Sequence, residues 1–117
     1  TYELRLNLDL LKAGGVSINV LRAIGGGAKS PLWLQLKADI TGIPVVTPKI
    51  TEAAGFGAAL LAGVGAGLFS SAAEAATSFL QLTHTYLPDP ARHAAYTRQY
   101  ELYRQVYPNI ASILHQL

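Results

Sequence analysis

The sequence predicts an α/β fold that is rich in helix and is built around one β-α-β unit. A mostly apolar run is followed by a glycine cluster, a helical pattern and a second short apolar run, which is the order that such a unit requires. Half of the 117 residues are hydrophobic and 14% are charged, so burial can offset the entropy of ordering the chain. Because domains of about 100 to 150 residues are the commonest size, we expect a single domain over residues 1–117.

The chain begins with a predicted helix and a predicted strand. A helix is expected over Glu3–Lys12, because Gly14 and Gly15 follow it as a C-terminal signal. The mostly apolar run over Asn19–Ile24, which Arg22 interrupts, predicts a strand with both faces covered.

The glycine cluster leads into a second helix and a second strand. Ser30 or Pro31 suits the start of this helix, and Gly42 suits a stop after about Ile40. A short strand is then expected over Pro44–Val46. The apolar stripe of the helix is expected to comprise Leu32, Trp33, Leu36 and Ile40.

The middle of the chain predicts two further helices. Thr51 as N-cap, with Glu52 in the first turn, favours a helix to about Gly67, and another is expected over Ala72–Leu82. The window Ala53–Ala73 carries no charge and is long enough to cross a bilayer. Its bulky apolar residues are few among Ala, Gly and Ser, so we expect a packed helix of a soluble protein and no membrane partner.

The C-terminal segment predicts one amphipathic helix. It is expected over Ala91–Leu117, after the connection Pro88–Pro90, with an interruption at Pro108. Its apolar positions are spaced by three and four residues, which indicates packing against the core. These positions are Tyr96, Tyr100, Tyr103, Tyr107, Ile110, Leu114 and Leu117.

The composition excludes several kinds of function. A net charge of +2 with few charged residues is too weak for dense phosphate contacts, so nucleic acid is not an expected partner. The absence of cysteine excludes disulfides, thiolate nucleophiles and cysteine-based metal sites, and it fits a cytoplasmic location. No signal-peptide pattern opens the chain, and the absence of methionine suggests a piece of a longer protein.

The most informative segment is Ile24–Trp33, which runs from the predicted strand through three glycines into a helix. Glycine has no Cβ, so backbone N–H groups can approach a ligand, and a helix start adds unpaired donors and partial positive charge. A phosphate group fits such a turn. Strand-to-helix turns also use glycine for geometric reasons, so this feature alone leaves both interpretations open.

Two familiar phosphate-binding patterns do not match this segment. The pattern Gly-x-x-x-x-Gly-Lys-Ser would include Lys29 and Ser30, but the chain has Ala23 and Ala28 where it needs glycine. The pattern Gly-x-Gly-x-x-Gly, started from Gly25, needs glycine at position 30.

Several segments in order along the chain carry a more specific signal. They are Ala23–Trp33, Gln35, Ala38–Gly42, Pro44–Val45, Glu52–Gly63 and Leu87–Tyr96. Together they resemble the C-terminal domain of the FGGY family of carbohydrate kinases, in the manner of its xylulose kinases. The resemblance implies part of an actin-like, ribonuclease-H-like ATPase fold. The chain would form part of the C-terminal, nucleotide-binding domain, and the N-terminal sugar-binding and catalytic domain would be absent.

The resemblance also implies where ATP binds. The expected cofactor-binding residues are Gly26, Gly27, Ala28, Lys29, Ser30 and Pro31. The first three would lie against the nucleotide, and the helix entry would border the adenine through apolar contact. For Lys29 a phosphate contact and a solvated position at the turn are both open.

The activity implied is transfer of the γ-phosphoryl group of ATP, with Mg²⁺, to a sugar hydroxyl. D-xylulose, giving xylulose 5-phosphate, is the first expectation. The partners would be ATP and a sugar, and the parent protein would be a homo-oligomer. Because the catalytic Asp of the family lies in the other domain, no catalytic residue is assigned here and the chain alone is expected to be inactive. The alternative is a non-catalytic helical assembly module, which would bury the tyrosine stripe and the small-residue helix against a partner.

Other polar or aromatic residues have structural interpretations. Asp39, well inside a helix, is expected to be a hydrogen-bond acceptor rather than a catalytic base. Glu52 is explained by its position at a helix start, and Trp33 by burial in the core. No metal site is expected, because no ligand-like spacing links the histidines, which are His84, His93 and His115.

Overall fold

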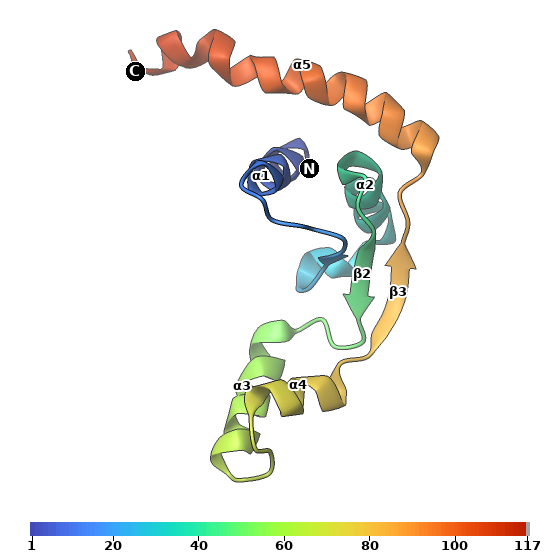
Figure 1. Ribbon diagram of the computed structural model, residues 1–117, viewed down its shortest axis with the longest axis vertical. Helices are drawn as coiled ribbons and strands as arrows, with labels where there is room; N and C mark the ends of the chain where they lie inside the picture. The colour runs from blue at the N-terminus through green and yellow to red at the C-terminus, as the bar shows by residue number, and fades with distance from the viewer. Residues whose placement is uncertain (117) are drawn as a thin grey trace.

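A mixed sheet of three strands lies at the centre of the chain (Figure 1). The computed structural model describes residues 1–116. The strand order is β1-β2-β3, with β1 at Leu21–Arg22, β2 at Val45–Pro48 and β3 at Leu82–Tyr86. β1 runs parallel to β2, and β3 runs antiparallel to β2. β2 is buried along its whole length because a strand lies on each side of it.

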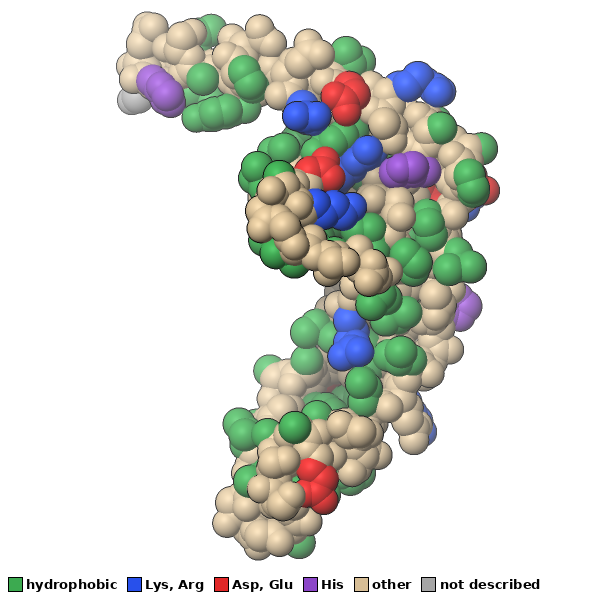
Figure 2. Space-filling view, in the orientation of Figure 1, with side chains coloured by type: hydrophobic (Ala, Val, Ile, Leu, Met, Phe, Trp, Pro, Cys, Tyr) green, Lys and Arg blue, Asp and Glu red, His purple; other side chains and the backbone are tan. Residues whose placement is uncertain are grey.

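The helices fall into two groups. They are α1 (Tyr2–Ala13), α2 (Pro31–Thr41), α3 (Ala53–Gly65), α4 (Ala72–Phe79) and α5 (Pro90–Leu114), and a short 3-10 helix, η1, spans Gly26–Lys29. α2 packs against both α1 and α5 at one end of the sheet, whereas α3 and α4 pair with each other in an arm at the other end (Figure 1). On the face shown in Figure 2, this arm carries mostly hydrophobic and uncharged side chains.

The predicted β-α-β unit is confirmed, but its first strand is shorter than Asn19–Ile24. The Leu21 amide donates to the Pro44 carbonyl at 2.8 Å, and the Ala23 amide donates to the Val46 carbonyl at 2.9 Å. These two hydrogen bonds mark the two ends of the pairing between β1 and β2. The backbone then leaves the sheet at Gly25, whose φ of +73° is a conformation that favours glycine.

The buried face of α2 agrees only in part with the predicted stripe, because Ile40 is buried as predicted but Leu32 and Trp33 are not. Leu34 and Ala38 form the core with Val45, each at most 1% exposed. Leu32 and Trp33 are 72% and 44% exposed, so their assignment to the core was wrong.

The boundaries of α2 agree with the sequence signals. The Ser30 hydroxyl accepts a hydrogen bond from the Trp33 amide at 3.3 Å, and Pro31 occupies the first turn. At the other end Gly42 adopts φ +69°, and the His93 ring from α5 packs directly against it. The C-terminus of α2 is therefore fixed by a glycine and by a side chain distant in sequence.

The segment between β2 and α5 departs most from expectation. Glu52, not Thr51, is the N-cap of α3, and the helix ends at Gly65 rather than at Gly67. The Thr51 carbonyl instead accepts the Gly25 amide at 2.7 Å, which holds Thr51 in the loop. The helix predicted over Ala72–Leu82 ends at Phe79.

β3, which follows α4, was not predicted. Its residues pair with β2 from Val45 opposite Tyr86 to Thr47 opposite His84, and the register shifts between Thr47 and Pro48. The threonines of β3 suit an extended backbone because they are β-branched. The Thr83 hydroxyl also donates to the Thr47 carbonyl at 3.1 Å across the two strands.

α5 begins as expected and continues through Pro108. The Asp89 carboxylate caps it by accepting the Arg92 amide at 2.8 Å. The predicted interruption at Pro108 was wrong, because α5 continues through this residue. Proline removes only one backbone N–H, so only the Arg104 carbonyl loses its donor. This carbonyl lies on an exposed stretch of the helix, where water can reach it. Leu117 of the predicted stripe lies outside the described residues.

The tyrosine stripe packs only in its first half. Tyr100 is 1% exposed, and its hydroxyl donates to the Asp9 carboxylate of α1 at 2.7 Å. The Tyr103 hydroxyl donates to the Glu3 carboxylate at 2.7 Å. Beyond these contacts α5 extends past α1, and its apolar side chains are exposed (Figure 1). Within residues 1–116, no helix combines the length and apolar character that crossing a bilayer requires.

Replacement of Gly42 is expected to destabilise the fold for two reasons. Gly42→Ala places a methyl group 2.7 Å from His93 Cε1 and forces alanine into φ +69°. We expect a loss of unfolding free energy of about 1–2 kcal/mol from the backbone conformation, with about 1–3 kcal/mol more from overpacking. Urea unfolding followed by circular dichroism measures it.

Gly15→Ala is the matched control, because Gly15 has φ +88° but nothing within 4 Å of an added Cβ. It should show the backbone cost alone. Equal losses in the two variants would contradict the role given to the contact between Gly42 and His93.

Candidate functional site

The glycine turn lies at the carboxyl end of β1, beside the loop that follows β2. Gly25 has φ +73° and ψ −167°, a conformation essentially confined to glycine. Its amide donates to the Thr51 carbonyl at 2.7 Å, which joins the two loops. Its carbonyl accepts the Ala28 amide at 3.0 Å, which closes the turn. The carboxyl ends of adjacent parallel strands are the usual place for a ligand in an α/β sheet.

Two backbone donors of the turn are available. Within residues 1–116, neither the Gly26 amide nor the Gly27 amide donates to a protein acceptor. Both glycines are exposed, and a Cβ on Gly26 would meet nothing within 4 Å. Ala28 is instead buried, so its methyl group anchors the turn. The turn can therefore present two N–H groups to an anion.

Two charged candidates from the sequence contact each other. Lys29 Nζ lies 3.0 Å from Glu52 Oε1, and both side chains are largely exposed. Lys29 is thus directed to the start of α3, and the Glu52 carboxylate has an ion-pair partner as well as its position at the helix start. Because exposed pairs contribute little to stability, an anion at the turn could compete for Lys29.

The helix entry offers fewer donors than a typical helix start. The Ser30 hydroxyl already accepts from the Trp33 amide, and Pro31 has no N–H. The exposed side chains of Leu32 and Trp33 instead give this entry an apolar surface. Such a surface fits the apolar contact expected here.

Lys37 lies beside the turn and was not singled out from the sequence. Its Nζ is 3.9 Å from where a Cβ on Gly27 would stand, and 5.7 Å from the centroid of the Trp33 ring. Its position four residues after Trp33 places both on the same face of α2, which is the signal that could have indicated it.

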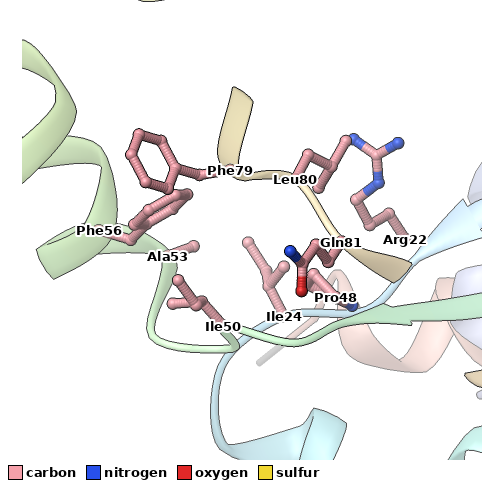
Figure 3. Close-up of a pocket in the computed structure, with 9 residues that line it drawn as sticks. All are labelled: Arg22, Ile24, Pro48, Ile50, Ala53, Phe56, Phe79, Leu80 and Gln81. Atoms are coloured by element: carbon pink, nitrogen blue, oxygen red, sulfur yellow. The ribbon is translucent and has the colours of Figure 1, made fainter. Parts of the chain in front are cut away.

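Two cavities flank β1. One of about 120 Å³ lies where β1 and the end of β2 meet the helical arm, and apolar side chains such as Ile24, Phe56 and Phe79 line most of it (Figure 3). The other, of about 300 Å³, lies between α1 and the sheet, and Arg22 and Lys37 lie on its wall. Arg22 lines both cavities.

Asp39 is a buried hydrogen-bond acceptor, as its position in the helix predicted. Its carboxylate accepts from Gln35 Nε2 at 2.9 Å, from the Asp89 amide at 2.8 Å and from Arg92 Nε at 2.7 Å. Burial raises the pKa of this carboxyl, but the hydrogen bonds from Asp89, Gln35 and Arg92 outweigh it and lower the pKa below the ordinary value. No proton transfer is assigned to Asp39, because its oxygens already hold these partners.

The histidines do not meet at one place. His93 Nδ1 lies 2.7 Å from the Asp39 carbonyl, His84 contacts Tyr86 within β3, and His115 lies near the end of α5. Among residues 1–116 no group of three or more His, Asp or Glu side chains is placed to hold a metal ion.

Comparison with known proteins gives concordant matches. Residues 1–66 match the FGGY family of carbohydrate kinases, C-terminal domain. The chain is 43% identical over 83 residues to an autoinducer-2 kinase of Escherichia coli K12, covering 71% of this chain and 16% of that protein. It is 34% identical over 107 residues to a xylulose kinase of Staphylococcus epidermidis ATCC 12228, covering 92% of this chain and 22% of that protein.

A solved structure shows the same fold. The crystal structure of xylulose kinase from Rhodospirillum rubrum superposes with a TM-score of 0.73 at 25% identity, over 97% of this chain and 23% of that one. The predicted fold class, a helix-rich α/β part of the actin-like, ribonuclease-H-like fold of these kinases, is confirmed. The chain spans between about a sixth and a quarter of the length of these proteins.

Removal of the Asp39 charge is expected to destabilise the fold and to change its acid sensitivity. Asp39→Asn should lower the unfolding free energy by about 1.5–3 kcal/mol, the range for hydrogen bonds to a charged group. Because the pKa of Asp39 is lowered by folding, its contribution is complete above the ordinary pKa of aspartate and is lost as pH falls through the folded value.

Urea unfolding between about pH 7 and pH 3 tests this, since acidification should weaken the wild type more than Asp39→Asn. Glu101→Gln is the control, because Glu101 pairs only with exposed Arg104, at 3.4 Å. Parallel pH profiles for wild type and Asp39→Asn would contradict the assignment.

Proposed function

Because the chain belongs to the FGGY family of carbohydrate kinases, as part of the C-terminal domain, we propose that it is the nucleotide-binding part of an ATP-dependent sugar kinase. The reaction of the whole protein would be transfer of the γ-phosphoryl group of ATP to a sugar hydroxyl. Residues 1–117 form a single domain in this proposal, with the sugar-binding and catalytic part supplied elsewhere.

The free amides of Gly26 and Gly27 are the observation that supports the proposal most. They stand at the carboxyl end of a parallel strand, exposed and without a protein acceptor among the described residues. Backbone donors fixed in this way stabilise phosphate charge without reorganisation. The cofactor-binding residues proposed remain Gly26, Gly27, Ala28, Lys29, Ser30 and Pro31. In this set the glycines contribute donors and the helix entry contributes apolar contact with the adenine.

Mg²⁺ would enter with the phosphates of the nucleotide. Within the described part of the chain no group of three or more carboxylates or histidines is placed to hold the ion, and we assign it no ligand there. The ion neutralises phosphate charge when it is bound in such kinases. We assign no catalytic residue to this chain, and the base that deprotonates the sugar hydroxyl is proposed to lie in the other domain.

D-xylulose is the sugar we propose first. The relative that aligns with 92% of the chain is named a xylulose kinase, whereas the autoinducer-2 kinase aligns with 71%. The product would be xylulose 5-phosphate.

A helical assembly module is the second candidate. Its support is the exposure of Leu61 and Leu68 on the arm formed by α3 and α4, at 63% and 74%, and of Tyr107 on α5, at 61%. Exposed apolar side chains mark an interaction surface where they form a continuous patch, which is what this candidate requires of the arm or of α5. Binding of nucleotide at the glycine turn separates the two candidates.

Titration of the chain with ATP and Mg²⁺ is expected to shift the backbone amide signals of Gly26–Ser30 in ¹⁵N-resolved NMR spectra. Gly26→Val should weaken binding by about tenfold or more, because the side chain would project into the open space in front of the free amides. Gly65→Val, also in open space but on the arm, is the control. Unmoved turn signals at saturating nucleotide would refute the nucleotide site and favour the assembly module.

A coupled phosphorylation assay tests whether the catalytic base and the sugar contacts lie in another domain, as proposed. The 117-residue chain with ATP, Mg²⁺ and D-xylulose is expected to give no turnover above the rate without protein, since the proposed base and sugar contacts lie elsewhere. Turnover by this chain alone would show that the catalytic base lies within it.

A further inference from the structure

The position of Lys37 gives the glycine turn a cation. Lys37 is half-buried on α2, and its Nζ lies 3.9 Å from where a Cβ on Gly27 would stand. The ammonium group also lies 5.7 Å from the Trp33 ring centroid, within the range of a cation–π contact that holds the side chain on this face of the helix.

Among the described residues, Lys37 and Arg22 have no carboxylate partner. Within residues 1–116 the ion pairs are Lys29 with Glu52, Arg92 with Asp39, and Arg104 with Glu101. Lys29 is therefore already paired, whereas Lys37 and Arg22 stand uncompensated on the wall of one cavity of about 300 Å³. Arg22 is exposed, but Lys37 is half-buried, and partly burying a cation without a counter-charge is unfavourable, so this space suits an anion.

The cavity continues toward the turn through the residues that follow β1. Ala23 and Ile24 line it, and Gly25 follows directly. The free amides of Gly26 and Gly27 and the Lys37 ammonium therefore belong to neighbouring surfaces. An anion held by these amides would lie within reach of the flexible lysine side chain.

We propose that Lys37 binds the phosphates of the nucleotide and makes the site select a charged nucleotide over the uncharged nucleoside. The inference rests on the proposed nucleotide site and identifies Lys37 as the residue of that site that recognises the phosphate charge. Lys29, the lysine of the turn itself, contributes less because Glu52 holds it. The Lys37 ammonium needs no such displacement, since Trp33 is its only aromatic or charged contact among the described residues.

Binding of ATP with Mg²⁺ and of adenosine to the 117-residue chain, measured by the same NMR titration, tests the proposal. Lys37→Gln is expected to weaken ATP binding about five- to tenfold, somewhat less than the loss of a fully buried hydrogen bond to a charged group, because the site is partly exposed. Adenosine binding should change by less than about twofold, and Lys37→Arg should retain most of the ATP affinity. Lys12→Gln, on the last turn of α1 and outside the cavity lining, is the matched control.

The outcomes separate this inference from the proposed function. If Gly26→Val weakens ATP binding but Lys37→Gln behaves like Lys12→Gln, the nucleotide site stands and the role of Lys37 is refuted. If Lys37→Gln weakens the binding of ATP and of adenosine equally, the role of Lys37 is also refuted. The lysine would then support the fold and would not recognise the phosphate charge. If the wild-type chain binds no ATP, the proposed function and this inference fail together.

Discussion

The buried carboxylate of Asp39 is the interaction on which the arrangement depends. It joins α2 to the start of α5 by accepting from Arg92 and from the Asp89 amide, about fifty residues away in sequence. The Asp39 carbonyl oxygen contacts His93 Nδ1, and the His93 ring packs against Gly42. α2 is thus held at this end by α5, and the glycine turn before its other end is tied to the loop after β2 by the bond from the Gly25 amide to the Thr51 carbonyl. A structural carboxylate thus helps to position the helix that follows the proposed nucleotide-binding turn, without touching the turn itself.

Features set by local chemistry could be predicted from the sequence, and features set by distant contacts could not. The start and end of α2 depend on Ser30, Pro31 and Gly42, whose backbone preferences act within a few residues. The buried face of the same helix depends on β2 and α5, so its stripe was assigned to Leu32 and Trp33. β3 was missed because its five residues are mostly exposed and follow a helical pattern without a break that the sequence marks clearly.

The candidate site shows the same division between backbone and side chains. The backbone donors of Gly26 and Gly27 could be predicted from the sequence, because glycine lacks a Cβ that would block access to its N–H group. The direction of Lys29 could not, since it depends on the loop after β2 being held by the bond from the Gly25 amide to the Thr51 carbonyl. Lys37 was overlooked for a related reason. It lies in α2 and not in the turn, and the orientation of α2 in the folded protein brings its side chain close to Gly27.

The dimensions of the chain bear on which of its surfaces carry function. A globular domain of this length has a radius of gyration of about 13 Å, whereas the value here is 18.4 Å because the arm and the end of α5 project from the sheet. The apolar side chains on these projections favour a covering surface, whether that surface belongs to the proposed kinase or to an assembly partner. Their exposure therefore does not distinguish the two proposed functions. The glycine turn does, because two free amides beside an unpaired lysine have no role in burying an apolar face but complement a phosphate.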